Sequence, residues 1–122
     1  MTVVPEKSEQ PRKLVWLVDS LDRLTSFPSS VRQKLGFALY QAQIGQKHES
    51  AKMLRSFKER VWQARADDSD GTYRTVYVAQ LGEAVYVLHA FEKKTQQTAK
   101  RDIDLGKSRF RVLVAERRRE RR

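Results

Sequence analysis

The chain has 122 residues, enough for one domain that buries a hydrophobic core without disulfide bonds. It contains no cysteine, which excludes disulfides, thiolate metal ligands and cysteine nucleophiles and makes a reducing cytoplasm the expected location. Its apolar runs, such as Leu14–Val18, are far shorter than the roughly 20 residues of a membrane-spanning helix, so we expect no membrane partner.

Positive charge is concentrated toward the C-terminus. The formal net charge is +10, and residues 93–122 contain 12 Lys and Arg against 4 Asp and Glu. Clustered cations favour a polyanionic partner, most often nucleic acid, because binding releases the counterions condensed on phosphates. The alternatives are an acidic protein partner or a basic tail without a role.

The first half of the chain predicts one strand and two helices. Residues 1–12 are predicted to form a flexible arm, because acids and bases alternate there without a hydrophobic signal core. A short buried strand follows at Lys13–Val18, and Asp19 or Ser20 caps a brief helix. The sequence SFPSS at 26–30 starts a longer helix that ends at Gly45. The apolar residues of this helix at three- and four-residue spacing are Val31, Leu35, Ala38, Leu39 and Ala42.

The second half predicts three strands and a final helix. A polar connecting segment, 46–60, leads to strands at Val61–Ala66, Thr72–Ala79 and Ala84–Phe91, with turns at 67–71 and 82–83. The helix from Thr98 onward places Ala99, Ile103, Gly106, Phe110 and Leu113 on one face. We expect Gly106 to pack closely against the sheet and Arg117–Arg122 to extend into solvent.

The order β-α-α-β-β-β-α predicts a single α+β domain over 13–115, followed by a basic tail at 116–122. Its sheet should be mostly antiparallel, with the helices packed on it.

Cations near the predicted sheet are the main functional signal. Lys93 and Lys94 stand between a strand and a helix start, where unpaired N–H groups favour anions; otherwise they keep a turn in water. Arg74 interrupts an apolar strand, and a buried arginine is costly unless it is paired or faces an open surface. Arg74 therefore either binds phosphate or pairs with an acid at the sheet rim. The acids within reach are Asp67, Asp68 and Glu83.

The histidines and aromatic residues give weaker signals. His48 and His89 lack metal-ligand spacing, so we expect no metal and no cofactor. Strand alternation places His89 on the face of Val85, Val87 and Phe91, which favours a satisfied, partly buried histidine over a general base. The rings of Trp62, Tyr73, Tyr77, Tyr86 and Phe91 offer stacking platforms for bases, although core packing is the favoured interpretation.

Three ordered segments resemble a known family. FPSSVRQKLGFALYQAQIG, AKML and DGTYRTVYVAQLGEAVYVLHAFEKKTQQTAKRDIDLGKSRF resemble the phage-derived Gp49-like branch of the HigB/RelE toxin superfamily, from about Lys13 to Leu113. The resemblance implies a RelE-like fold and a type II toxin neutralised by a helix-turn-helix antitoxin. It also implies a metal-independent endoribonuclease, an mRNA interferase that cleaves messenger RNA on the ribosome and so inhibits translation.

The resemblance also implies site residues. The catalytic set is Arg65, Arg74, Lys93, Lys94 and His89, with Arg74 as phosphate clamp and the lysine pair shared between clamp and acid/base duty. The residues expected to contact RNA are Lys52, Thr95, Lys100, Arg101 and Arg109. Two positions depart from the family pattern: Gln63 replaces an expected acid, which puts the pairing of Arg65 in doubt, and Gly106 replaces a small alanine.

Two other functions fit the sequence. One is a non-catalytic RNA-binding or ribosome-binding protein that retains only the charge. The other is a phage interaction protein whose basic helix docks on an acidic partner.

Overall fold

The structure is a computed structural model that describes residues 11–55, 57, 61–94 and 100–120. Within these residues, five strands form one sheet in the order β1-β5-β4-β3-β2. The elements are β1 Lys13–Trp16, α2 Ser20–Thr25, α3 Ser29–Gln43, β2 Lys52–Met53, β3 Trp62–Asp67, β4 Thr72–Leu81, β5 Ala84–Lys93 and α4 Lys100–Glu120.

The α+β class and the element order are confirmed, with one addition. β1 runs parallel to β5, and the other strand pairs are antiparallel. The predicted connecting segment at 46–60 contains the short strand β2, which pairs with the start of β3. A two-residue strand is too short to show an alternation of apolar and polar residues, which explains why the sequence pattern missed it.

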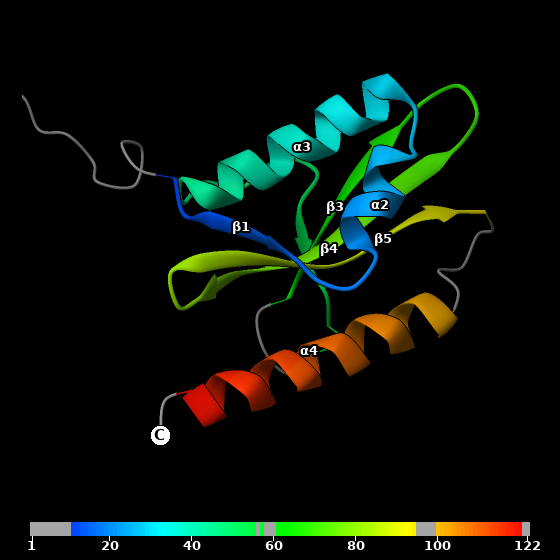
Figure 1. Cartoon of the computed structure of the whole chain (residues 1–122). Coiled ribbons are helices and arrows are strands. Elements are labelled where there is room, and N and C mark those ends of the chain that lie inside the picture. The colour runs from blue at the N-terminus through cyan, green and yellow to red at the C-terminus, as the bar shows by residue number, and fades with distance from the viewer. Residues whose placement is uncertain (1–10, 56, 58–60, 95–99, 121–122) are drawn as a thin grey trace, which may run out of the picture.

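The sheet carries helices on both faces. α2 and α3 cover one face and α4 crosses the other, as Figure 1 shows. The first core lies under α3 and contains Leu24, Val31, Leu35, Ala38, Leu39, Ala42, Ala64, Ala66, Tyr73, Tyr77, Val85, Val87 and Ala90. The second core lies under α4 and contains Phe57, Val61, Val76, Val78, Leu88, Phe91, Phe110 and Leu113. All five apolar residues predicted for the α3 stripe are buried in the first core.

An irregularity in the β4–β5 ladder corrects the predicted face of His89. Val76 pairs with His89 but Tyr77 pairs with Val87, so Leu88 is an extra residue on β5. Such a bulge reverses the alternation of side chains beyond it. Val85 and Val87 therefore belong to the first core, whereas His89 turns toward α4 and bonds to Asp102. The prediction that His89 shares a face with these two valines is wrong.

The final helix is longer than predicted, and its glycine has a different neighbour. α4 runs through Glu120, so residues 117–120 are helical rather than frayed, although residues 118–120 are exposed to solvent as predicted. Arg117 folds back and donates to the Tyr86 hydroxyl at 3.2 Å. A Cβ added at Gly106 would lie 3.4 Å from the ring of Phe57, so this glycine packs closely against Phe57 rather than against the sheet itself.

Parts of the predicted arm, final helix and tail lie outside the described residues. Residues 1–10 of the predicted arm, Thr98 and the last two arginines lie outside the described residues. Arg12 is anchored: its guanidinium donates to the Ala79 carbonyl, and its own carbonyl accepts a bond from Gln43 Nε2 at 2.6 Å. Within the described part of the chain, every helix is too short or too polar to span a bilayer.

Two glycines make a stability prediction. Gly36 lies inside α3 with nothing within 4 Å of an added Cβ, so Gly36→Ala should raise the free energy of unfolding by about 1 kcal/mol through helix propensity. Gly82 has a positive φ of 66°, and an added Cβ would meet the guanidinium of Arg117. Gly82→Ala should therefore lower the free energy of unfolding by roughly 1–2 kcal/mol. Urea unfolding monitored by circular dichroism measures both; equal effects of the two variants would contradict the backbone assignment.

Candidate nucleic-acid interface

A row of cations crosses the part of the sheet that α4 leaves open. Residues paired across neighbouring strands point to the same face. Arg65 pairs with Arg74, and Arg74 pairs with Phe91, which packs in the second core under α4. Lys52 pairs with Gln63, two residues before Arg65, and therefore lies on the same face. The sheet thus brings Lys52, Arg65 and Arg74 together, and Lys93 follows two residues after Phe91.

Arg74 is the central member of this row and the least satisfied. It is half-buried, and its Nε is buried without a hydrogen-bond partner among the described residues. Burial, and then the neighbouring charge of Arg65, lower the pKa of Arg74 from its ordinary value, and the charge of Asp67 partly opposes this shift. Within the described part of the chain the rim acids form no ion pair with Arg74; Asp67 lies 3.6 Å from Arg65 Nε. An incoming anion would therefore relieve both the unmet donor and the repulsion between the two arginines.

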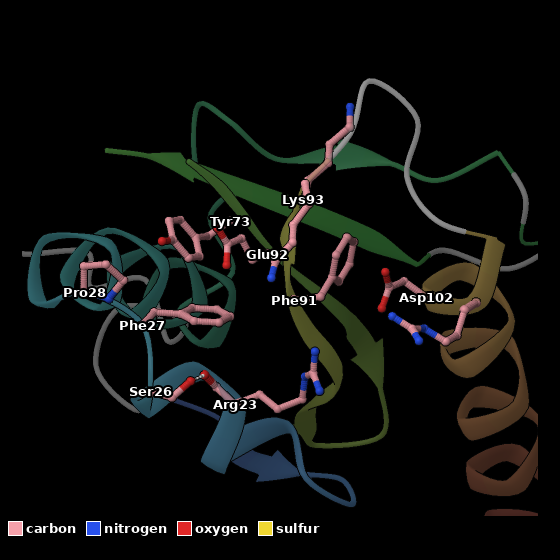
Figure 2. A pocket seen from close by; sticks show the side chains of 11 residues that line it. Arg23, Ser26, Phe27, Pro28, Tyr73, Phe91, Glu92, Lys93 and Asp102 are labelled. Atoms are coloured by element: carbon pink, nitrogen blue, oxygen red, sulfur yellow. Dashed lines mark hydrogen bonds between the residues drawn. The ribbon is translucent and has the colours of Figure 1, made fainter. Parts of the chain in front are cut away.

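A cavity of about 570 Å³ adjoins the row at the end of β5. Figure 2 shows side chains from the α2–α3 region, from β4 and β5 and from the first turn of α4 around it. Its lining residues are Arg23, Ser26, Phe27, Pro28, Tyr73, Phe91, Glu92, Lys93, Lys94, Arg101 and Asp102. Lys93 and Lys94 therefore line a pocket and do not merely keep a turn in water.

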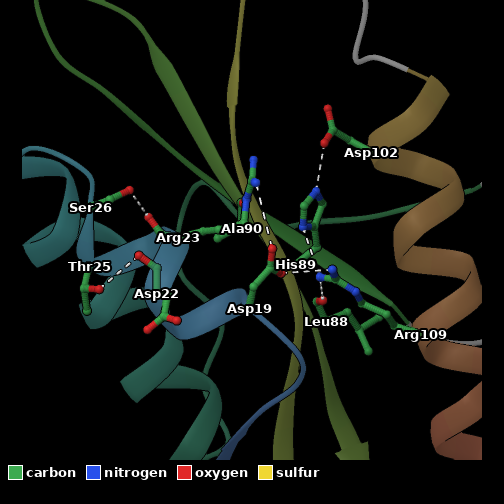
Figure 3. A network of polar contacts seen from close by, with 10 residues as sticks. All are labelled: Asp19, Asp22, Arg23, Thr25, Ser26, Leu88, His89, Ala90, Asp102 and Arg109. Carbon is green, nitrogen blue, oxygen red and sulfur yellow. Dashed lines mark hydrogen bonds and ion pairs between the residues drawn. The ribbon is translucent and has the colours of Figure 1, made fainter.

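His89 is held in a buried polar network, shown in Figure 3. Its side chain is 1% exposed, and Nε2 lies 2.8 Å from Asp102 Oδ1. Arginine can only donate, so the Arg109 Nη1 contact at 3.3 Å makes His89 Nδ1 an acceptor and assigns the Nε2–H tautomer. Burial lowers the pKa of His89; the Asp102 contact opposes this shift, and the charges of Arg109 and Arg23 add to it. The imidazole is neutral and enclosed, a geometry that suits a structural role and gives no support to catalysis.

Arg109 belongs to the same network. Its Nη2 lies 2.9 Å from Asp19 Oδ1, and its Nη1 donates to the Leu88 carbonyl at 2.9 Å. The Arg109 side chain is only 11% exposed, so its donors join α4 to β5 and to the start of α2. The predicted RNA contact by Arg109 has no support in this arrangement.

The other predicted RNA contacts divide into three groups. Lys52 and Arg101 are exposed, and Arg101 lines the pocket. Lys100 is exposed on the first turn of α4 and forms an ion pair with Asp104 at 3.3 Å. Thr95 lies outside the described residues. Core packing, the favoured interpretation of the aromatic residues, holds for Tyr77, whose pKa burial raises to about 12, and for Phe91.

The chain is similar to a protein family and to a solved toxin structure. A family described as phage-derived protein Gp49-like matches residues 22–111, about three quarters of the chain. The chain belongs to the Gp49-like family. The Gp49-like chain also matches the solved structure of a double arginine-to-alanine mutant of the E. coli toxin RelE in its free state, with a TM-score of 0.57. The identity is 18%, and the match covers 77% of this chain and 96% of the RelE chain.

The predicted RelE-like fold and the membership in the Gp49-like family are thereby confirmed. Curated protein sequences give no match to the chain. Among the residues that the structure describes, no three His, Asp or Glu side chains gather in a way that could hold a metal ion.

The sequence did not single out several residues that line the pocket of this Gp49-like protein, among them Glu92 on β5 and three that long-range contacts bring there. Arg23, Phe27 and Asp102 come from α2, from the loop after it and from α4, and each meets β5 or β4 only in the folded chain. Phe27 stands in the SFPSS start of α3, where the sequence signal concerned the helix alone. No local pattern distinguishes these residues from ordinary surface positions.

The network predicts a pH effect on stability. The unfolded state protonates His89 near its ordinary pKa of 6.5, whereas the folded state binds that proton only at lower pH. Stability should therefore be full above about pH 6.5 and fall below it, by at most about 1.4 kcal/mol per pH unit from this group. His89→Gln keeps a donor and an acceptor but cannot titrate, so it should lose less stability on acidification.

Urea unfolding of both proteins at about pH 7.5 and about pH 5.5 measures this difference. The two proteins differ only at position 89, so the comparison isolates His89. An equal loss in the two proteins would show that His89 does not have the lowered pKa.

Proposed function

We propose that this Gp49-like protein is the toxin of a type II toxin-antitoxin pair, an endoribonuclease that cleaves messenger RNA on the ribosome in the cytoplasm and so inhibits translation. The observation that carries the proposal is the half-buried, incompletely bonded Arg74 at the centre of the cation row. Family membership and the RelE-like fold support the same reading. The proposed partners are messenger RNA, the ribosome and a small helix-turn-helix antitoxin.

The chemistry requires charge stabilisation more than anything else. The 2′-oxygen gives up its proton and attacks the adjacent phosphorus, which forms a phosphorane with extra negative charge. The 5′-oxygen then takes up a proton and leaves, and the other RNA fragment ends in a 2′,3′-cyclic phosphate. Arg74, presented beside Arg65 on the open sheet face, would bind the non-bridging oxygens of that phosphate. Preorganised donors of this kind gain strength where charge develops in the transition state.

Lys93 and Lys94 complete the proposed site. Lys93 ends β5 next to the row and Lys94 follows it, and neither forms an ion pair within the described residues. Their positive charge would neutralise the same phosphate. One lysine, as its neutral amine, would accept the proton of the 2′-oxygen, and the other, as its ammonium, would donate a proton to the leaving 5′-oxygen. His89 would act only by positioning, because its network fixes the first turns of α4 beside β5.

The proposal predicts that expression without an antitoxin arrests growth and shortens transcripts. Arg74→Ala combined with Lys94→Ala should slow cleavage by at least about 100-fold, because two phosphate-binding groups are removed. Growth curves and mapping of RNA ends, in extracts with and without translating ribosomes, measure the loss. Both altered residues lie away from the buried network, so the double variant should fold.

The matched control is Lys13→Ala combined with Arg32→Ala, which removes the same charge from exposed positions on β1 and α3. It should arrest growth like the wild type. Full arrest by a folded Arg74→Ala/Lys94→Ala variant would remove these residues from the mechanism. Absence of arrest and of cleavage by the wild type would refute the toxin proposal itself.

A further inference from the structure

The pocket at the end of β5 extends beyond the cation row onto the other side of the sheet. Glu92 pairs with Tyr73, whose ring packs in the first core, so both residues face α3 rather than α4. The cavity of about 570 Å³ thus joins the lysine pair to a chamber between β5 and the α2–α3 junction. The proposed cleavage chemistry uses Lys93 and Lys94 at one side of this cavity and none of the residues that line its α2–α3 side.

One wall of the chamber is an aromatic ring held in place. Phe27 is half-buried and contacts Tyr73 with ring centroids 4.9 Å apart and planes at 50°. Figure 2 shows Phe27 beside Pro28 on one side of the pocket, with Phe91 across from it. A fixed, partly exposed ring next to phosphate-binding cations is the usual platform for an unpaired base.

Cations surround this ring at the pocket edge. Arg23 Nε donates to the Ala90 carbonyl at 2.6 Å, which holds its guanidinium beside β5. Lys94 and Arg101 are exposed and form no ion pair within the described residues. These three side chains suit the phosphates on either side of a bound nucleotide.

The chamber also contains an acceptor that nothing in the described chain satisfies. Of its two carboxylates, Asp102 is bonded to His89, whereas Glu92 makes no hydrogen bond or ion pair with another described residue. A carboxylate accepts only, so it favours the amino groups of adenine, cytosine and guanine. Uracil presents two carbonyl oxygens around a single N–H and would be repelled.

We infer that this chamber is a base-selective RNA subsite that stacks one unpaired base on Phe27 and uses Glu92 to discriminate against uracil. The inference rests on the proposed function insofar as RNA is the ligand. It assigns a source of sequence preference to residues separate from Arg74, which has no part in reading the base.

The test is equilibrium binding of short fluorescent 2′-O-methyl homopolymers, which cannot be cut because their 2′-oxygen is blocked. The wild-type protein should bind the adenine and cytosine strands several-fold more tightly than the uracil strand. Glu92→Gln, which adds a donor at the same position, should reduce that preference to less than about twofold. Phe27→Ala should weaken binding of every strand by about tenfold through lost stacking.

Two further variants control for the loss of an aromatic ring elsewhere and for unfolding of Phe27→Ala. Phe37→Ala removes an exposed ring from α3 and should leave binding unchanged. Arg101→Ala alters an exposed residue, so it should fold, and it should weaken all strands and flatten the salt dependence of binding. If Phe27→Ala is unfolded by circular dichroism, the Glu92→Gln and Arg101→Ala results decide.

Equal wild-type affinity for all strands, or an unchanged preference in Glu92→Gln, would overturn the inference. The proposed function fails separately: a protein that shows the predicted preference but cuts no RNA on translating ribosomes would refute cleavage and retain the subsite.

Discussion

The position of α4 on the sheet is the constraint on which the proposed site depends. α4 covers the second core with Phe110 and Leu113 but leaves the ends of β3, β4 and β5 open. The buried His89–Asp102 bond and the Arg109–Asp19 ion pair fix its first turns at that boundary. Breaking one partner of a buried pair is costly, because the other is left without compensation. The same network therefore stabilises the fold and defines the edge of the interface.

The two neighbouring arginines on this surface destabilise the folded protein but favour the binding of an anion. Arg65 and Arg74 face each other across neighbouring strands, and of the two only Arg65 forms an ion pair with a described residue. Like charges directly opposite each other destabilise a sheet, and a buried donor without a partner adds to that cost. Both costs would fall if a phosphate bound there, as we propose. A site that is unsatisfied when empty and satisfied when occupied is expected where stability has been exchanged for function.

Local periodicity predicted the elements, and long-range contacts decided the details. The stripe from Val31 to Ala42 follows the 3.6-residue period, and the cations of the row stand out as charges in apolar strands. The bulge at Leu88 is invisible in an alternating pattern, because one extra residue leaves no mark in the composition. Arg23 meets Ala90 across 67 positions, and His89 meets Asp102 only when α4 docks, so neither contact had a local signal. Sequence therefore indicated the cation row better than the pocket beside it.

We propose that Arg74 binds the RNA phosphate through its Nε–H, the donor without a partner among the described residues. The side-chain Nε–H resonance of Arg74, followed in a ¹⁵N-labelled sample titrated with an uncleavable 2′-O-methyl RNA strand, reports on this bond. We expect a large, saturable shift of this resonance and slower exchange of its proton with water, because the donor gains a phosphate oxygen. An unchanged Arg74 resonance under conditions where the strand is fully bound would show that Arg74 does not bind the phosphate.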